Sequence, residues 1–232
     1  MSAADTPKDA VTHPTFRMFD GFAPYAETVA AMQAHAAAIR AGTADEEVWC
    51  LEHAPVLTGG TSALRDDLVN PGGIPVHETG RGGQWTYHGP GQRVAYVMLD
   101  LQRRKPDVRA YVHALEEWVI TALASFGVAG TRREGLPGIW VASPTIQGRL
   151  DKIGAIGVRI SRWVTWHGVA VNLDPDLAAF ETIIPCGVRD GGVTSLRQLG
   201  IAADMDTLDA ALRQSFNTAF PAAADQSIRS SR

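Results

Sequence analysis

The sequence has only two cysteines, Cys50 and Cys186, among its 232 residues. The chain contains no Cys-x-x-Cys and no His-x-x-x-His pair, so neither a disulfide framework nor a local zinc signature is present. No metal is therefore expected. In a reducing compartment both cysteines are expected to be free thiols.

Long apolar runs and an excess of basic residues are also missing. No apolar stretch approaches the roughly 18 residues that a membrane-spanning helix needs, and residues 1–14 lack the apolar core of a signal peptide. The formal net charge of −4 argues against a general nucleic-acid binder. We expect a cytoplasmic protein that contacts neither membrane nor nucleic acid. Its small basic clusters, expected to be solvated, are Arg103-Arg104-Lys105, Arg132-Arg133, and Arg159 with Arg162.

The length and composition predict one ordinary globular domain. Hydrophobic residues make up 45 % and charged residues 20 % of the chain, which is typical of such domains. Polar tails are expected at 1–14 and 221–232, with the globular domain at 15–220. Neither a low-complexity linker nor an internal repeat divides this range.

Four segments are predicted to be helical. Residues 24–41 are rich in alanine and end at Gly42, and residues 107–126 begin at Asp107, a good N-cap. A short helix is expected at 194–199 and a longer one at 206–219. The helix at 107–126 is predicted to bury one apolar stripe, made of Val108, Tyr111, Leu115, Trp118, Ala122 and Phe126.

The predicted strands lie between these helices. Residues 47–60 indicate a strand that enters a turn, and the apolar run 94–101 is typical of a buried strand. Three further strands are expected at 138–143, 152–161 and 164–173, the last two forming a hairpin with its turn at Ser161–Arg162. The elements do not alternate regularly as β-α-β, which predicts an α+β fold with a mixed sheet flanked by helices.

Residues 81–92, RGGQWTYHGPGQ, carry four glycines in twelve positions. The segment matches neither the dinucleotide pattern Gly-x-Gly-x-x-Gly nor a P-loop, and a strand rather than a helix follows it. One interpretation is a wall of exposed backbone groups against an apolar ligand with one polar end. The alternative is a bulged hairpin rich in turn residues.

Cys186 lies in the sequence ETIIPCGVRDGG, between a proline and a glycine. This setting favours a positioned thiol in a turn, although a buried structural cysteine is the usual alternative. Cys50 lies inside an apolar strand and is expected to pack in the core.

A thiol becomes nucleophilic as the thiolate, so Cys186 needs a basic or cationic neighbour. The candidates are Lys152, His88 and His167. Lys152 begins the glycine-containing strand KIGAIGVRI, and its ammonium could stabilise a thiolate or, desolvated, act as a base. Alternatively, Lys152 snorkels to solvent from a strand end, and His167 is a hydrogen-bonded histidine near the core.

Four motifs in one order together resemble the lipoyl(octanoyl) transferase family. They are RGGQWTYHGPGQ, KIGAIGVRI, WHGVAVNL, and IIPCGV with TSL, and the resemblance spans roughly residues 45–200. It implies a fold of the biotin- and lipoate-protein ligase type, which is related to class II aminoacyl-tRNA synthetases.

The resemblance also implies an activity. Octanoyl (or lipoyl) groups would pass from acyl carrier protein to one lysine of apo lipoyl domains, such as those of 2-oxoacid dehydrogenase complexes and the glycine cleavage H protein. Cys186 matches the nucleophile that carries the acyl thioester, and Lys152 matches the residue that lowers its pKa. The stretches that match the acyl-binding pocket are Arg81, Gly82, Gly83, Gln84, Trp85, Thr86, Tyr87 and His88; Ala155, Ile156 and Gly157; and Gly168, Val169 and Ala170. Trp85, Tyr87 and His88 are expected to shape a tunnel for the acyl chain.

Two other functions remain possible from the residues alone. A lipoate-protein ligase would share the fold but would activate a free acid with ATP and would not need Cys186. A non-catalytic acyl-binding module would use the same pocket without chemistry. Because a thioester is already activated, the transferase needs no nucleotide and no cofactor, and a monomer is expected.

Overall fold

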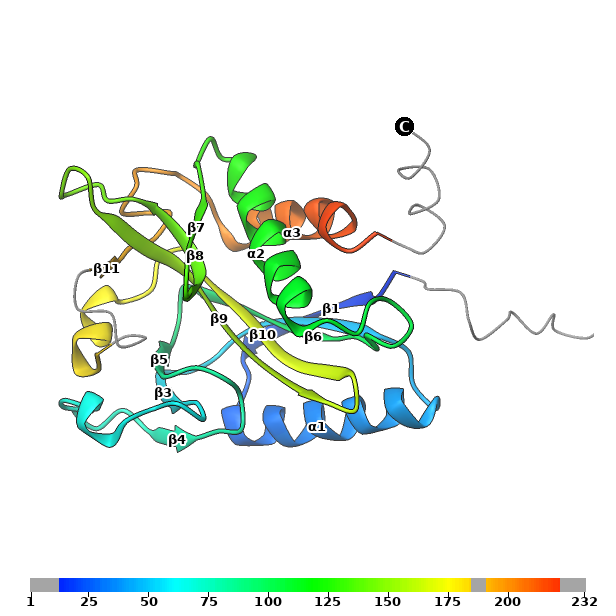
Figure 1. Ribbon diagram of the computed structural model, residues 1–232. Coiled ribbons are helices and arrows are strands. Elements are labelled where there is room, and N and C mark those ends of the chain that lie inside the picture. The colour runs from blue at the N-terminus through cyan, green and yellow to red at the C-terminus, as the bar shows by residue number, and fades with distance from the viewer. Residues whose placement is uncertain (1–12, 185–190, 222–232) are drawn as a thin grey trace, which may run out of the picture.

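The computed structural model describes residues 13–184 and 191–221. Within these ranges eight strands form a mixed sheet, with α1 (Tyr25–Ala41) on one face and α2 (Val108–Ala124) and α3 (Met205–Ala219) on the other (Figure 1). In spatial order the strands are β1 (Thr15–Phe22), β2 (Glu47–Glu52), β6 (Gln92–Met98), β10 (Val164–Asn172), β9 (Leu150–Ser161), β8 (Leu136–Ala142) and β7 (Thr131–Arg133), and β11 (Gly192–Val193) pairs with β9.

The pairing directions confirm the predicted α+β class with a mixed sheet. β1–β2 and β11–β9 are parallel, and the other neighbours are antiparallel. The predicted hairpin is β9–β10, and its turn residues Arg162 and Trp163 have φ of 48° and 68°. β11 pairs with the start of β9, next to the stretch along which β9 pairs with β10.

A second, smaller sheet lies beside the main one in the order β4 (Val76–Glu78), β3 (Val56–Gly59), β5 (Trp85–His88). Short 3₁₀ turns at η1 (Arg65–Asp67) and η2 (Leu177–Thr182) flank it. Residues 47–60, predicted as a strand that enters a turn, begin with the strand β2 and its turn as expected, but a second strand, β3, follows the turn. Pro55, which has no N–H for a ladder, lies in the connection between β2 and β3, and the two strands belong to different sheets.

Alternation along β6 divides the core into two layers. Ala95 and Val97 pack toward α2 and α3, whereas Tyr96 and Met98 pack in the α1 layer. The strand is buried on both faces, as the apolar run predicted, although it begins at Gln92 and ends at Met98. Cys50 faces the layer of α2 and α3 and is 1 % exposed, which confirms its packing role.

The three long helices confirm the predicted ones to within two residues. Gly42 ends α1 in the left-handed conformation at φ 71°, and the carboxylate of Asp107 accepts a hydrogen bond from the Ala110 N–H at the start of α2. Asp204 caps α3 in the same way. Val108 departs from the predicted stripe: as the first residue of α2 it is 47 % exposed, whereas Trp118 is fully buried.

The short helix predicted at 194–199 is absent from the described residues, which form turns there. Three backbone N–H groups of this segment, those of Thr194, Leu196 and Arg197, are bonded to distant parts of the chain. The Thr194 N–H donates to Lys152 O at 3.0 Å, and the Leu196 N–H donates to Asn172 O at 3.0 Å. These bonds hold the segment against β9 and the end of β10.

Candidate active site

A cavity of about 330 Å³ opens between the glycine-rich segment and strands β6, β9 and β10. It brings together all the sequence-predicted acyl-binding residues except Tyr87, together with Lys152. The predicted residues on its wall are Arg81, Gly82, Gly83, Gln84, Trp85, Thr86, His88, Ala155, Ile156, Gly157, Gly168, Val169 and Ala170. Segments far apart in the sequence thus form one site.

Tyr87 lies elsewhere, which corrects the expectation that it shapes the cavity wall. Residues 85–88 form strand β5, so Thr86 and His88 point to one face and Trp85 and Tyr87 to the other. Trp85 packs in the same hydrophobic cluster as Tyr87 but also contributes to the cavity wall. The ring of Tyr87 packs against Phe180 with centroids 5.4 Å apart, in a separate hydrophobic cluster. The glycine-rich segment is accordingly a turn followed by a strand that pairs with β3.

The glycines make room for Arg81. A Cβ on Gly157 would lie 2.9 Å from Cδ and 3.1 Å from Nη1 of Arg81, and Gly83 adopts a φ of +92°. The buried guanidinium of Arg81 donates to Thr58 O at 2.7 Å and to Gln84 O at 3.0 Å. Arg81 therefore fastens the turn at 81–84 to β3, and the absence of side chains allows this close approach.

Three buried histidines and two tyrosines gather on the α1 side of the cavity. His53 contacts the Tyr96 hydroxyl at 2.8 Å, and the ring of His53 lies 6.0 Å from that of His88. The rings of Tyr25 and His88 are stacked with centroids 6.4 Å apart, and the rings of Tyr96 and His167 lie edge to face with centroids 5.7 Å apart. Aromatic rings with polar edges therefore form much of this side.

These imidazoles are neutral at physiological pH. Burial, followed by the neighbouring His53, lowers the pKa of His88 to about 3. Burial, followed by the Arg81 charge, lowers the pKa of His167 to about 3, and burial also lowers the pKa of His53. Neither His88 nor His167 thus offers a positive charge to a thiolate, which is one of the two roles, proton acceptor or cation, considered for them from the sequence.

Lys152 lies on β9 and is 6 % exposed, so the interpretation as a lysine that snorkels to solvent is wrong. Its Nζ donates to Pro137 O at 3.1 Å and lies 4.7 Å from the centre of the Trp140 ring. The side chain is part of the cavity wall. A buried amine on the wall of an apolar cavity is suited to exchanging protons with a bound group.

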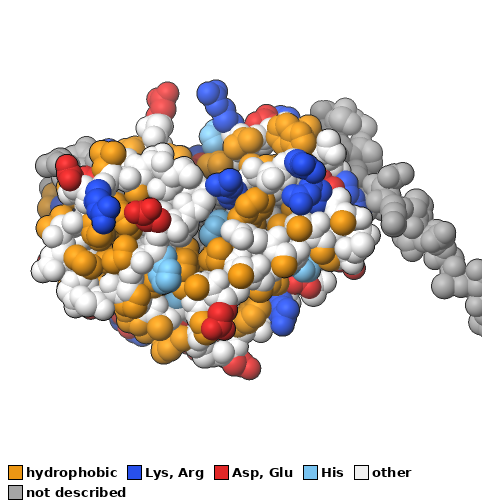
Figure 2. Space-filling view, turned by 90° about the horizontal axis from the view of Figure 1, so that it is seen from below, with side chains coloured by type: hydrophobic (Ala, Val, Ile, Leu, Met, Phe, Trp, Pro, Cys, Tyr) orange, Lys and Arg blue, Asp and Glu red, His pale blue; other side chains and the backbone are white. Residues whose placement is uncertain are grey.

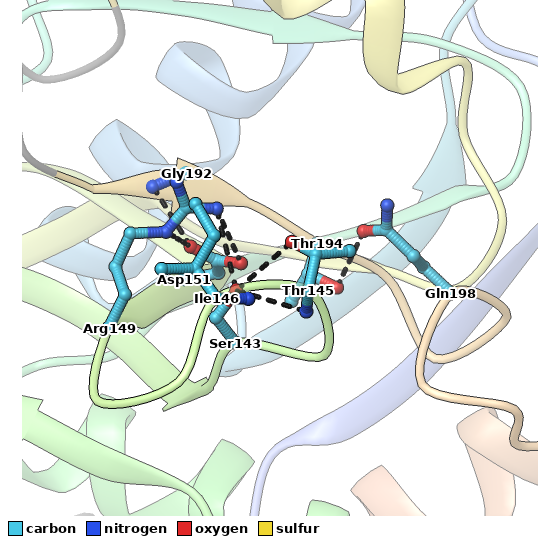
Figure 3. A network of polar contacts seen from close by, with 8 residues as sticks. All are labelled: Ser143, Thr145, Ile146, Arg149, Asp151, Gly192, Thr194 and Gln198. Atoms are coloured by element: carbon cyan, nitrogen blue, oxygen red, sulfur yellow. Dashed lines mark hydrogen bonds and ion pairs between the residues drawn. The ribbon is translucent and has the colours of Figure 1, made fainter.

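Cys186 lies outside the described residues, and the residues on either side of 185–190 are attached to different parts of the fold. The Ile184 N–H donates to Asp67 O at 2.8 Å. On the other side the Gly192 N–H donates to the buried carboxylate of Asp151 at 3.0 Å, which also pairs with Arg149 at 2.7 Å (Figure 3). The second attachment lies directly beside Lys152 in the sequence.

Several cavity residues were missed by the sequence analysis. Tyr25 begins α1, Tyr96 and Val94 lie in the apolar run of β6, and Leu136 and Pro137 precede the buried part of β8. For Tyr96 the signal was available, because a hydroxyl in a strand buried on both faces needs a polar partner. Tyr25 carried no local signal.

On the face in Figure 2, basic and acidic side chains are interspersed among hydrophobic ones. Within the described residues, no group of three or more His, Cys, Asp or Glu side chains could hold a metal ion. In the same part of the chain, each helix is too short or too polar to cross a bilayer.

Two bacterial proteins of similar sequence are named octanoyltransferase. The octanoyltransferase of Cereibacter sphaeroides is 58 % identical over 207 residues, which cover 87 % of this chain and 95 % of that protein. The octanoyltransferase of Paramagnetospirillum magneticum is 58 % identical over 207 residues, covering 89 % and 97 %.

Solved structures with the same fold are more distant in sequence. A putative lipoate protein ligase from T. acidophilum with bound lipoic acid superposes with a TM-score of 0.69 at 14 % identity, covering 90 % of this chain and 86 % of that one. A lipoate-protein ligase A bound with ATP gives 0.70 at 14 % identity, with coverage of 90 % and 86 %. At this sequence identity, the two structural similarities show a shared fold and nothing about function.

The family model described as the lipoyl protein ligase A/B catalytic domain matches residues 24–217. This match includes every cavity residue predicted from the sequence. The resemblance drawn from the four motifs is confirmed, and the chain belongs to the lipoyl protein ligase A/B catalytic domain family.

Proposed function

We propose that the protein is an acyltransferase that moves an octanoyl group from acyl carrier protein to a lysine of apo lipoyl domains. The relatives at 58 % identity that are named octanoyltransferase support this activity over the ATP-dependent ligase. The observation that carries the proposal is a buried amine, that of Lys152, on the wall of a cavity of about 330 Å³. This volume lies near the lower end of the range of about 300–1,000 Å³ for small-molecule sites, which suits one short acyl chain.

In the first step, Cys186 acts as the nucleophile. Lys152 takes the thiol proton, and the thiolate sulfur attacks the carbonyl carbon of the octanoyl thioester. A new C–S bond to Cys186 forms, and the bond to the carrier's sulfur breaks. That sulfur leaves as a thiolate and receives the proton from Lys152. Because one thioester replaces another, no nucleotide is consumed.

In the second step, the amine of the target lysine attacks the acyl-enzyme. An amide C–N bond forms, the C–S bond to Cys186 breaks, and the proton released by the amine passes to Lys152. Lys152 then returns a proton to the Cys186 sulfur or holds it as the ammonium beside the thiolate. One amine thus serves both halves of the reaction.

The cavity supplies binding energy for the acyl chain. Each buried methylene contributes about 0.8 kcal/mol, so chains of different length differ in affinity. Arg81 and the glycines around it would define one part of this wall, while the neutral His88 and His167 leave the cavity without a cation from either imidazole. The residues proposed to contact the chain are those on the cavity wall named above.

The finer assignments belong to the same proposal. The acceptors would be the lipoyl domains of 2-oxoacid dehydrogenase complexes and the glycine cleavage H protein, and the enzyme would act as a monomer without a cofactor. A reaction that depends on a free thiol favours the reducing cytoplasm. The catalytic domain would occupy residues 15–220. Of the polar tails predicted at 1–14 and 221–232, residues 1–12 and 222–232 lie outside the described residues.

Intact-mass analysis after mixing the protein with octanoyl-acyl carrier protein tests the proposal. We expect one octanoyl adduct that maps to Cys186, is absent in Cys186→Ser, and disappears when an apo lipoyl domain is added. Formation of a lipoyl adenylate from ATP and lipoate would instead identify a ligase. Ligand binding without an adduct would identify an acyl-binding module.

A further inference from the structure

Glu116 is a charged side chain inside the protein. It lies on α2 and is 3 % exposed, whereas its neighbour Glu117 has a side chain that is 48 % exposed. A buried carboxylate is costly unless its oxygens have partners. Oε2 of Glu116 pairs with Arg132 Nε at 3.0 Å, and Oε1 accepts from the Gly138 N–H at 3.1 Å.

The second of these contacts leads directly to Lys152. The Gly138 N–H and the Pro137 carbonyl belong to the same peptide group. Its N–H donates to Glu116, and its oxygen accepts from Lys152 Nζ at 3.1 Å. Glu116, one peptide group and the Lys152 amine therefore form a continuous hydrogen-bonded chain. A carboxylate at the N–H end of a peptide polarises its carbonyl and strengthens the bond at the other end.

The backbone at Gly138 fits closely around the lysine. Gly138 has a φ of +140°, a conformation that favours glycine. A Cβ at this position would lie 2.9 Å from Cε and 3.1 Å from Nζ of Lys152. The peptide that Glu116 holds is thus in van der Waals contact with the amine and admits no side chain between them.

We infer that Glu116 is a positioning residue for Lys152, acting through the Pro137–Gly138 peptide group. It fixes the direction of the carbonyl that receives the amine, and its negative charge favours the protonated form of that amine. The inference rests on the proposed function, in which Lys152 exchanges a proton twice in each cycle. Setting the protonation balance of Lys152 would then set the pH range of transfer.

Other charged groups on the elements around this chain have partners of their own. Arg132 on β7 also pairs with Glu117, and Arg133 lies 4.7 Å from the Trp140 ring, as Lys152 does. His113 on α2 contributes its backbone oxygen to Arg132. Asp151 on β9 pairs with Arg149, and Asp209 on α3 pairs with Arg93.

Amine labelling measures the effect without relying on catalysis. The chain has three lysines, Lys8, Lys105 and Lys152. Acetic anhydride labelling across a pH series, read by peptide mass, gives the pH at which Lys152 is half-reactive, and Lys105, with a side chain 73 % exposed, serves as internal reference. In Glu116→Gln, which keeps an acceptor for the Gly138 N–H but removes the charge, we expect this midpoint to fall by about one pH unit, a tenfold change in proton affinity.

Two further variants make the result specific. Glu117→Gln removes the exposed partner of the same arginine and should leave the Lys152 midpoint unchanged. Arg132→Gln removes the positive charge beside Glu116 and should move the midpoint to higher pH, which keeps the inference testable if Glu116→Gln does not fold. The pH profile of octanoyl transfer should shift in parallel with the labelling midpoint.

The outcomes separate the two proposals. A Lys152 midpoint that is the same in the wild type, Glu116→Gln and Arg132→Gln overturns the positioning role, whatever the transfer assay shows. A wild-type protein that forms no octanoyl adduct overturns the proposed function, even where the labelling midpoint shifts as expected.

Discussion

The Nδ1 atom of His88 lies 2.6 Å from the side-chain oxygen of Gln92, inside the protein. The amide nitrogen of Gln92 donates to Tyr87 O and to Asn172 Oδ1, so its oxygen is the acceptor and His88 must donate from Nδ1. The side-chain amide of Asn172 in turn donates to the backbone oxygen of Thr194, and the backbone N–H of Thr194 donates to Lys152 O. One polar chain thus fixes the tautomer of His88 and ties the cavity to the backbone of Lys152.

This neutral form of His88 makes stability depend on pH. The pKa of His88 and that of His167 are lowered from 6.5 to about 3 in the folded protein, so the unfolded chain binds more protons between these values. Stability is therefore fully present above about pH 6.5 and is lost as the pH falls toward 3. We expect each of the two histidines to account for about 2 kcal/mol of lost stability between pH 7 and pH 5.

Urea unfolding at both pH values measures this loss. His167→Asn removes one of the two groups while keeping a residue that tolerates the positive φ of 58° at this position. This variant should lose about 2 kcal/mol less than the wild type over the same interval. His113→Gln, at an exposed position on α2, is the control and should behave like the wild type. Equal losses in all three proteins would contradict the buried, neutral state of His167.

Much of the fold was accessible from local patterns, and the failures have physical reasons. Asp107 and Gly42 marked helix ends because capping is a local interaction, and the β9–β10 hairpin followed from two apolar runs with a short turn. The segment 194–199 has a helical pattern, but the N–H groups of Thr194 and Leu196 donate to Lys152 and Asn172, which are distant in sequence. Local propensity contains no information about such partners.

In the candidate site, too, residues with a local sequence signal were predicted and those placed by tertiary contacts were not. Residues 81–88 and Lys152 stood out because glycines and a lone lysine in a strand are unusual. Tyr87 was placed in the cavity because the segment was treated as a loop, whereas the alternation of strand β5 turns its ring toward Phe180. The role of Glu116 could not be predicted from the sequence, because a glutamate in an amphipathic helix ordinarily faces solvent. Only tertiary packing brings its carboxylate to the Gly138 N–H.

The two cysteines should differ sharply in reactivity. Burial, followed by the charge of Asp209, raises the pKa of Cys50 to about 12, so its thiol stays protonated and inaccessible. Iodoacetamide at pH 7.5 should add one carboxamidomethyl group to the native protein, at Cys186, and two after unfolding in guanidinium chloride. Modification of Cys50 in the native protein at the rate seen after unfolding would show that the core around β2 is open.

Lys152→Ala should slow the formation of the octanoyl adduct by about 10²–10⁴-fold at neutral pH, the usual contribution of a general acid–base group. The difference in rate between Lys152→Ala and the wild type should become smaller as the pH rises, because the thiol of Cys186 then ionises without a base. Rapid-quench mass analysis over a pH series measures this. Lys105→Ala removes a solvent-exposed lysine of the same chain and should leave the rate unchanged. An adduct that forms at the wild-type rate in Lys152→Ala would remove Lys152 from the mechanism.

Gly157→Ala tests whether the absence of a side chain at this position of β9 is needed to admit Arg81. The added Cβ would lie 2.9 Å from Arg81 Cδ and 3.2 Å from Gly82 O, so the arginine or the turn at 81–84 must shift. Overpacking of this kind costs about 1–3 kcal/mol of stability. Because Arg81 and Gly82 are part of the cavity wall, we expect octanoyl transfer to fall more than tenfold, which exceeds the effect of a comparable stability loss elsewhere.

Gly130→Ala supplies that comparison. Its Cβ would lie 3.1 Å from Ile120 Cγ1, a crowded position away from the cavity. The side chain of Ile120 can adjust, so this variant should lose stability but keep its transfer rate at temperatures where it is folded. If Gly157→Ala and Gly130→Ala lowered transfer only in proportion to their stability, the close approach of Arg81 to β9 would serve folding and not the shape of the acyl site.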